Sequence, residues 1–150
     1  MNKQSIQKRG SIALAGAVMA LALLTACVST DQNTAFKLVN TDRAANGKRA
    51  LVLDNELSTK AQAWSAHLAA TGTLAHSTLT SGVTSCYKAL GENVGKGSSI
   101  ANVEKSWMTD AGVNPPIHRN NILGSSTHVG TGVTLKGGVY WVVYVFRTAC

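Results

Sequence analysis

The sequence has only two prolines, and its fourteen glycines follow no repeat, which excludes collagen-like and proline-rich proteins. It is also poor in charge: 14% of the residues are charged, whereas 45% are apolar. That balance excludes intrinsic disorder, because disordered chains combine low hydrophobicity with high charge. At 150 residues, with no internal repeat, the chain is predicted to form one domain.

Acidic residues are scarce, with seven against fourteen basic ones, so the formal net charge is +7. Three of the basic residues, Lys3, Lys8 and Arg9, lie among the first 26 positions, and the remainder has eleven basic and seven acidic residues, or +4. These charges are scattered, with no basic run interleaved with aromatic residues. Nucleic-acid binding needs clustered Lys and Arg to displace counterions, so we do not expect a nucleic-acid partner.

The first 26 residues have the pattern of a secretory signal peptide. Positive charges stand in residues 1–9, no charged residue occurs in 10–30, and residues 12–26 are almost wholly apolar or small. A retained membrane-spanning helix is the alternative, but crossing a bilayer takes about 20 predominantly apolar residues and this stretch is shorter and rich in alanine.

The signal peptide ends in Leu24, Thr25, Ala26 and Cys27, which resembles the lipobox of bacterial lipoproteins. The resemblance implies that Cys27 carries a diacylglycerol and becomes the first residue of a 124-residue mature chain, a durable anchor if several acyl chains are attached. Val28, in place of an aspartate, resembles the class sorted to the outer membrane, so we expect an envelope protein facing the periplasm or the surface. The alternative is a plain secreted protein. The predicted organisation is a lipoprotein signal peptide over 1–26, a lipidated tether over 27–33 and a domain over 34–150.

Only two other cysteines occur, Cys86 and Cys150. An even pair in an oxidising compartment predicts a disulfide bond between them, with two free thiols as the alternative.

Periodicity predicts helices in the first two thirds of the domain and strands at its end. A first helix is expected from residue 34 to about 46, a second from its cap Asp54 to about 71, and a third after Ser98 or Ser99. Residues 129–135 and 139–146 predict a hairpin. Because the second strand is apolar on both faces, helices must cover each side of the sheet, which predicts a layered α+β domain.

Four segments then appear in a specific order: Leu74 to Ser77, the tripeptide Gly91-Glu92-Asn93, Trp107-Met108, and the run from His118 to Leu123. Together they resemble the CAP superfamily, named for cysteine-rich secretory proteins, antigen 5 and pathogenesis-related group 1 proteins, over residues 36–146. The resemblance implies that family's three-layer α-β-α sandwich, with a mainly antiparallel sheet between helices.

The resemblance also implies a cleft with two histidines and two acidic residues. His76 and His118 match the histidines, Glu92 matches the first acid, and Asp110 is the candidate for the second, with Glu104 as a less fitting alternative. Some members bind a divalent metal through the histidines, so His76 and His118 are candidate zinc ligands. The open alternative is a structural cluster joined by hydrogen bonds. A further histidine, His67, stands beside Trp64 and is expected to be partly buried.

Because several CAP proteins are described as binding sterols or other lipids, the resemblance favours a binding module over an enzyme. Its ligand would be a small apolar molecule, a wall fragment or a protein partner, and the membrane would be a second partner through acylated Cys27. One alternative is a divalent-metal hydrolase, in which His76 and His118 hold the ion and Glu92 acts as the base. Another is a structural or host-interaction protein of the envelope. Ser77 adjoins His76, but no nucleophile-elbow motif surrounds it.

Overall fold

The computed structural model describes residues 28–150. The predicted signal peptide and the predicted lipid site at Cys27 lie outside these residues. The described elements, in chain order, are α1 (Thr30–Ala45), β1 (Val52–Leu53), α2 (Asn55–Thr71), β2 (Tyr87–Gly97), α3 (Ile100–Thr109), α4 (Ile117–Leu123), β3 (His128–Lys136) and β4 (Val139–Ala149). None of the helices within 28–150 combines the length and apolar character needed to cross a bilayer.

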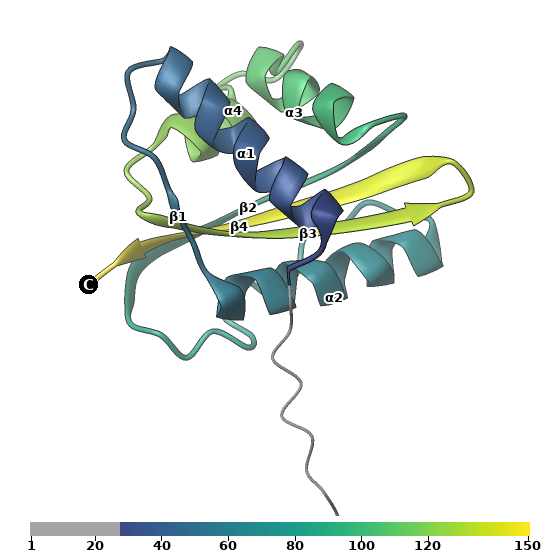
Figure 1. Ribbon diagram of the computed structural model, residues 1–150, viewed down its shortest axis with the longest axis horizontal. Coiled ribbons are helices and arrows are strands. Elements are labelled where there is room, and N and C mark those ends of the chain that lie inside the picture. Colours follow the sequence, from purple (N-terminus) through teal and green to yellow (C-terminus); the bar gives the residue numbers. More distant parts are fainter. Residues whose placement is uncertain (1–27) are drawn as a thin grey trace, which may run out of the picture.

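The strands form one mixed sheet in the order β1-β3-β4-β2. β1 pairs with β3 in parallel, whereas the β3/β4 and β4/β2 pairs are antiparallel. α2 lies alone on one face of the sheet, and α1, α3 and α4 lie on the other (Figure 1). This arrangement confirms the predicted α+β sandwich.

β4 forms the centre of both cores. Its two faces are lined by alternating residues: Val142, Tyr144 and Phe146 on one side, and Trp141, Val143 and Val145 on the other. The first set packs against residues of α1, α3 and α4, and the second packs against α2. β4, which is apolar on both faces, is therefore covered by helices on each side, as the sequence predicted.

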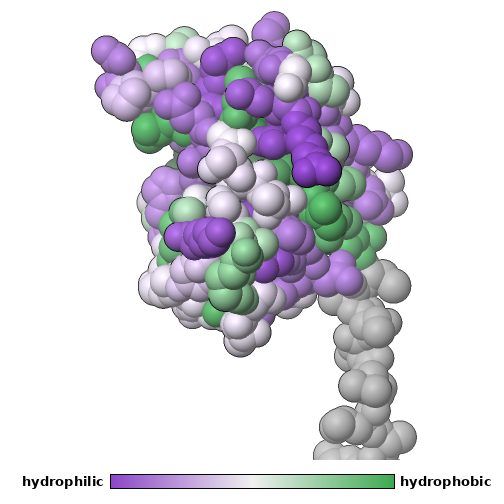
Figure 2. Space-filling view, turned by 90° about the vertical axis from the view of Figure 1, so that its left-hand side faces the viewer, coloured by the Kyte–Doolittle hydropathy of each residue, from purple (hydrophilic) through white to green (hydrophobic). Residues whose placement is uncertain are grey.

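The surface shows the complementary pattern. Figure 2 shows one side of the molecule on which apolar areas are broken up by hydrophilic residues. The large hydrophobic side chains that remain exposed in the described part are Val52, Leu74, Tyr87, Val113, Ile117 and Leu135.

Capping residues set the helix ends. Asp54 caps α2 through the amide of Leu57, and Gly72 ends it in the left-handed conformation, as predicted. Of the two candidate caps for α3, Ser99 is the one used. α1 starts at Thr30, four residues before the predicted start, because Ser29 and Gln32 form a reciprocal capping box.

The early start of α1 corrects the predicted tether. Gln32 is buried, its side-chain nitrogen donates to the Thr131 carbonyl at 2.6 Å, and its own carbonyl accepts from the Thr131 hydroxyl at 3.0 Å. The last residues of the expected tether over 27–33 are therefore part of a helix fixed to β3.

Two elements near the candidate site, β2 and α4, were not predicted. β2 contains Gly91, Gly95 and Gly97, which weaken the signal for a strand. Gly95 is needed because α3 packs closely over it: a Cβ there would lie 2.7 Å from a methyl group of Val103.

The predicted disulfide bond is confirmed. Cys86 and Cys150 are joined, with their Cα atoms 5.7 Å apart, and the bond ties the residue before β2 to the residue after β4. The two strands pair from Tyr87 opposite Ala149 onward. The bridge therefore closes the end of the β2/β4 ladder.

The contact between α2 and the sheet depends on two glycines of β3. A Cβ on Gly130 would lie 2.0 Å from the backbone of Leu57, and one on Gly132 would lie 2.1 Å from the backbone of Ala61. No real Cβ occupies such positions, so α2 rests directly on the β3 backbone.

We therefore expect Gly132→Ala to lower the free energy of unfolding by at least about 3 kcal/mol, because α2 has to lift off the sheet. Urea unfolding followed by tryptophan fluorescence measures this loss. The matched control is Gly137→Asn in the β3/β4 turn, where φ is +58° and no atom lies within 4 Å of the new Cβ. Asparagine tolerates this conformation, so the control should lose less than about 1 kcal/mol, and equal losses would contradict the packing argument.

Candidate functional site

Glu92 joins the loop after α2 to the sheet. It lies on β2 opposite Val145 of β4 and its side chain is buried. One carboxylate oxygen, Oε1, lies 2.8 Å from His76 Nδ1 and accepts from the Ser77 amide at 2.8 Å. The other, Oε2, accepts from the Ser77 hydroxyl at 2.6 Å. Both oxygens of Glu92 are thus engaged within the protein, while the His76 side chain is 56% exposed.

Asp110 plays the same part between two helices. It ends α3 in the left-handed region, at φ 42°, and its side chain is buried. Its Oδ1 lies 2.6 Å from His118 Nδ1, and its Oδ2 accepts from the Arg119 amide at 2.9 Å. α4 has no side-chain cap of its own, so Asp110 supplies the acceptor for its first turn.

The two pairs present their histidines in the same way. A carboxylate can only accept, so Nδ1 of each ring carries the proton that it shares with Glu92 or Asp110. Nε2 is therefore the ring nitrogen left to meet a ligand on both His76 and His118. The histidines are oriented by buried acids, an arrangement that sets their tautomer as well as their position.

Asn93 and Asn121 connect the two pairs through the backbone. Asn93 is fully buried, and its side-chain nitrogen donates to the His118 carbonyl at 3.0 Å. The side-chain nitrogen of Asn121, Nδ2, donates to Asn93 Oδ1 at 2.9 Å and to the backbone carbonyl of Glu92 at 3.3 Å. Within residues 28–150, no hydrogen bond or ring stacking joins one histidine–carboxylate pair directly to the other, so the convergence of all four on one ligand stays a prediction.

A small polar cavity lies beside the second pair. Its volume is about 210 Å³, and its lining includes Leu74, Lys96, Trp107, Asp110, Val113 and His118. Trp107 is buried, stacks on the His118 ring at 6.4 Å and meets Tyr144 edge-on at 4.9 Å. The lining does not include His76 or Glu92.

Glu104, the alternative for the fourth position, does not belong to this site. It is buried between α3 and its neighbours, and neither of its carboxylate oxygens has a hydrogen-bond partner among the described residues. Burial, with a smaller contribution from the nearby Asp42, raises the pKa of Glu104 to about 8. The hydroxyl of Tyr144 donates to the Ala35 carbonyl at 2.9 Å. The acid that holds His118 is therefore Asp110.

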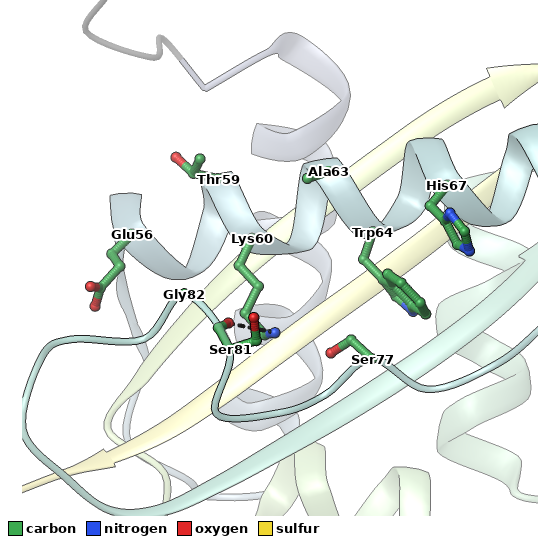
Figure 3. A pocket seen from close by; sticks show the side chains of 9 residues that line it. All are labelled: Glu56, Thr59, Lys60, Ala63, Trp64, His67, Ser77, Ser81 and Gly82. Atoms are coloured by element: carbon green, nitrogen blue, oxygen red, sulfur yellow. Dashed lines mark hydrogen bonds between the residues drawn. The ribbon is translucent and has the colours of Figure 1, made fainter.

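A larger groove, which the sequence did not predict, runs along α2. Its volume is about 590 Å³, and Trp64, His67, Lys60 and Ser77 are among its lining residues (Figure 3). The lining is mostly apolar. His67, expected to be partly buried, is exposed and stacks on Trp64 with the ring centres 4.6 Å apart. The only sequence signal for this pair was its spacing of three residues on one helix.

Three side chains of α2 fix the loop that forms the other wall of the groove. Trp64 Nε1 donates to the Ala75 carbonyl at 2.9 Å, and Lys60 Nζ donates to the carbonyls of Thr78 and Ser81 at 2.8 and 2.9 Å. Glu56 accepts from the amides of residues 84 and 85, and hydrogen bonds from these residues lower its pKa to about 2. The groove is therefore preformed.

The donor set does not match a catalytic zinc site. Such sites use three protein ligands and keep one position for water. Here Glu92 and Asp110 already accept hydrogen bonds on both oxygens, which leaves two imidazole Nε2 atoms. Within the described residues, no group of three or more His, Cys, Asp or Glu side chains is placed to hold a metal ion.

The sandwich and its two histidine–carboxylate pairs define the class of protein. A family model described as the cysteine-rich secretory protein family, CAP, matches residues 36–146. The chain belongs to this family.

Individual relatives agree with this assignment. The chain is 31% identical over 123 residues to the uncharacterized protein YkwD of Bacillus subtilis, an alignment that covers 75% of this chain and 46% of the relative. The chain thus spans about half the length of that protein.

Two solved structures share the fold. One is an extracellular protein containing a SCP domain from Bacillus anthracis, with a TM-score of 0.64 and 21% identity, covering 78% of this chain and 40% of that one. The other is an outer surface protein from Borrelia burgdorferi, with a TM-score of 0.66 and 16% identity, covering 83% of this chain and 96% of that one.

The bonds around Glu92 predict a structural role for its carboxylate. Glu92→Ala leaves the partly buried amide and hydroxyl of Ser77 without their buried acceptor, so we expect a loss of about 3 kcal/mol in the free energy of unfolding. Glu56→Ala is the matched control, because Glu56 holds amides of the same loop from a more solvent-accessible position and should cost less than about 1 kcal/mol. Urea unfolding of both variants compares them, and a similar loss in each would contradict the role of burial.

The raised pKa of Glu104 predicts a pH dependence of stability. The neutral carboxyl makes its full contribution to the free energy of unfolding below its ordinary pKa of 4.5. This contribution to stability is lost as the pH rises through about 8. Glutamine does not ionise, so Glu104→Gln removes this pH-dependent loss of stability. The free energy of unfolding of the variant, relative to that of the wild type, should therefore rise between pH 5 and pH 8.5, by about 1.4 kcal/mol for each unit of the pKa shift. In an Asp42→Asn background the gain should shrink, because a neighbouring negative charge is gone. Parallel pH profiles of wild type and Glu104→Gln would show that Glu104 is not the titrating group.

Proposed function

We propose that this chain is an extracytoplasmic binding protein, held in a membrane of the cell envelope by acylated Cys27, and that it is not an enzyme. The lipobox at residues 24–27 supports the anchor. The family supports an extracellular or envelope location, since one structural relative is described as an extracellular protein and another as an outer surface protein.

One observation carries the choice of binding over catalysis: both site acids are used as internal hydrogen-bond acceptors. A carboxylate that acts as a general base has to reach water or substrate, and the side chains of Glu92 and Asp110 are each 1% exposed. The oxygens of Glu92 accept from His76 and Ser77, and those of Asp110 accept from His118 and Arg119. These acids are buried and hold segments together, which suits a rigid binding surface better than proton transfer.

The groove along α2 is the binding site that the geometry supports best. Small-molecule sites are concave, mostly apolar and of about 300–1,000 Å³. The groove has this size, and most of its lining surface is carbon, although Ala63 and Trp64 are the only apolar side chains among its lining residues. The bonds from Trp64 and Lys60 fix its two walls relative to each other. Its occupant would be a small apolar or amphipathic molecule of the lipid class, with the aromatic pair Trp64 and His67 against its hydrocarbon part.

A fluorescent fatty acid, cis-parinaric acid, tests this assignment. Ala63 lines the groove and is exposed, so Ala63→Phe should fill the groove and weaken binding by about tenfold or more, equivalent to 1.4 kcal/mol. Ala101→Phe, an exposed alanine on α3, is the matched control and should bind like the wild type. If the wild type does not bind the probe, or if both variants bind it equally well, the groove is not a lipid site, and a wall fragment or a protein partner becomes the ligand to test.

A further inference from the structure

The place where the described chain begins restricts how an anchored molecule can sit. Ser29 caps α1, and Gln32 in the first turn of that helix is bonded to Thr131 of β3 in both directions. From Ser29 onward the chain is therefore part of the rigid body. Cys27 stands two residues before Ser29, so an acyl anchor on its sulfur is attached within about 7 Å of backbone from the folded domain.

This starting point lies beside α2. Val28 and Gln32 line a cavity of about 370 Å³ together with residues of α2, among them Thr59, Ala63 and Ala66. Thr59 and Ala63 also line the groove on the other side of the same helix. Figure 1 shows the beginning of the described chain next to α2, the helix that alone covers one face of the sheet.

The outward side of α2 carries no free charge. Its only two charged residues are Glu56 and Lys60, and both point to the loop wall of the groove (Figure 3). Apart from His67, which stacks on Trp64 in the groove, and the terminal Thr71, the exposed positions are occupied by short, uncharged side chains: Asn55, Thr59, Ala63, Ala66 and Ala70. One lysine from outside the helix, Lys136 of β3, donates to the Ala70 carbonyl at the C-terminal end of this face. α1 and α3, on the opposite face, expose Lys37 and Lys105. An uncharged surface can approach lipid headgroups without desolvating an ion, and the absence of large apolar side chains favours contact over insertion.

We propose that the outward face of α2, defined by Asn55, Thr59, Ala63, Ala66 and Ala70, lies against the membrane that holds Cys27. This inference rests on the proposed anchor. It places the α2 groove at the bilayer surface, where an amphipathic molecule can pass between membrane and protein. It also places α3, α4 and the His118–Asp110 pair on the far side of the sheet, facing the aqueous compartment.

Site-specific quenching in vesicles tests the orientation. The disulfide bond occupies Cys86 and Cys150, and the acyl group occupies Cys27, so a single introduced cysteine is the only free thiol. Ala66→Cys on α2 and Ala101→Cys on α3 are both exposed helical alanines and form a matched pair. Each lipidated, full-length variant is labelled with the same fluorophore and reconstituted into vesicles of phosphatidylethanolamine and phosphatidylglycerol that contain a lipid with a nitroxide on its headgroup.

We expect severalfold stronger quenching at position 66 than at position 101. A spacer of ten Gly and Ser residues between Val28 and Ser29 should abolish the difference, because a flexible linker frees the domain to rotate. Equal quenching at the two positions in the native-length lipidated protein, or stronger quenching at 101, would overturn the orientation and leave the anchor intact. Mass spectrometry before reconstitution separates the other failure: a Cys27 without an acyl group would overturn the anchor itself and, with it, the orientation.

Discussion

β4 is the element on which the arrangement of the whole domain depends. A central strand that is apolar on both faces is stable only if each face is covered, and no single layer can cover both. Helices α1, α3 and α4 therefore pack on one face of β4, around Tyr144 and Phe146. Helix α2 packs on the other face, around Val143 and Val145. The two surfaces of functional interest are separated by this requirement, since the α2 groove lies on one side of the sheet and the His118 cavity lies with the helices of the other.

Buried acids then join the layers where the backbone changes direction. Glu92 fixes the loop after α2 to β2, and Asp110 fixes the end of α3 to the start of α4. In each case the carboxylate satisfies a backbone amide as well as a histidine, so the same group positions the ring and stabilises the turn. A buried carboxylate without such partners is costly, as the raised pKa of Glu104 shows. The residues that give the site its geometry are thus also part of the fold's internal hydrogen bonding.

The sequence predicted the elements whose signals are local. α2 has a capping aspartate, a regular apolar stripe and a terminal glycine, and the hairpin alternates visibly, so both were predicted close to their observed bounds. β2 was missed because two of its glycines, Gly95 and Gly97, allow the close packing of α3, and Gly91 faces Asn121 of α4, contacts that sequence periodicity does not contain. The start of α1 was missed because a polar residue, Gln32, is buried by a bond to Thr131, 99 positions away. For the site, the family resemblance named the histidines and acids. Which acid holds which histidine came only from the structure, and their joint action on one ligand stays a prediction.

A short connection between a lipid and a rigid body has a consequence that a long tether lacks. With six or seven flexible residues, as first expected, the domain would rotate freely, and no face would be distinguished by the anchor. With α1 beginning at Thr30, the position of the first helical turn on β3 would decide which face an acyl anchor at the proposed site, Cys27, brings to the lipid. The glycines of β3 that bring α2 onto the sheet and the bond that fixes α1 to the same strand act together, because they place the start of the chain beside α2. The packing that stabilises the sandwich would in this way also orient it, with one surface toward the membrane and the histidine-bearing surface toward the solvent.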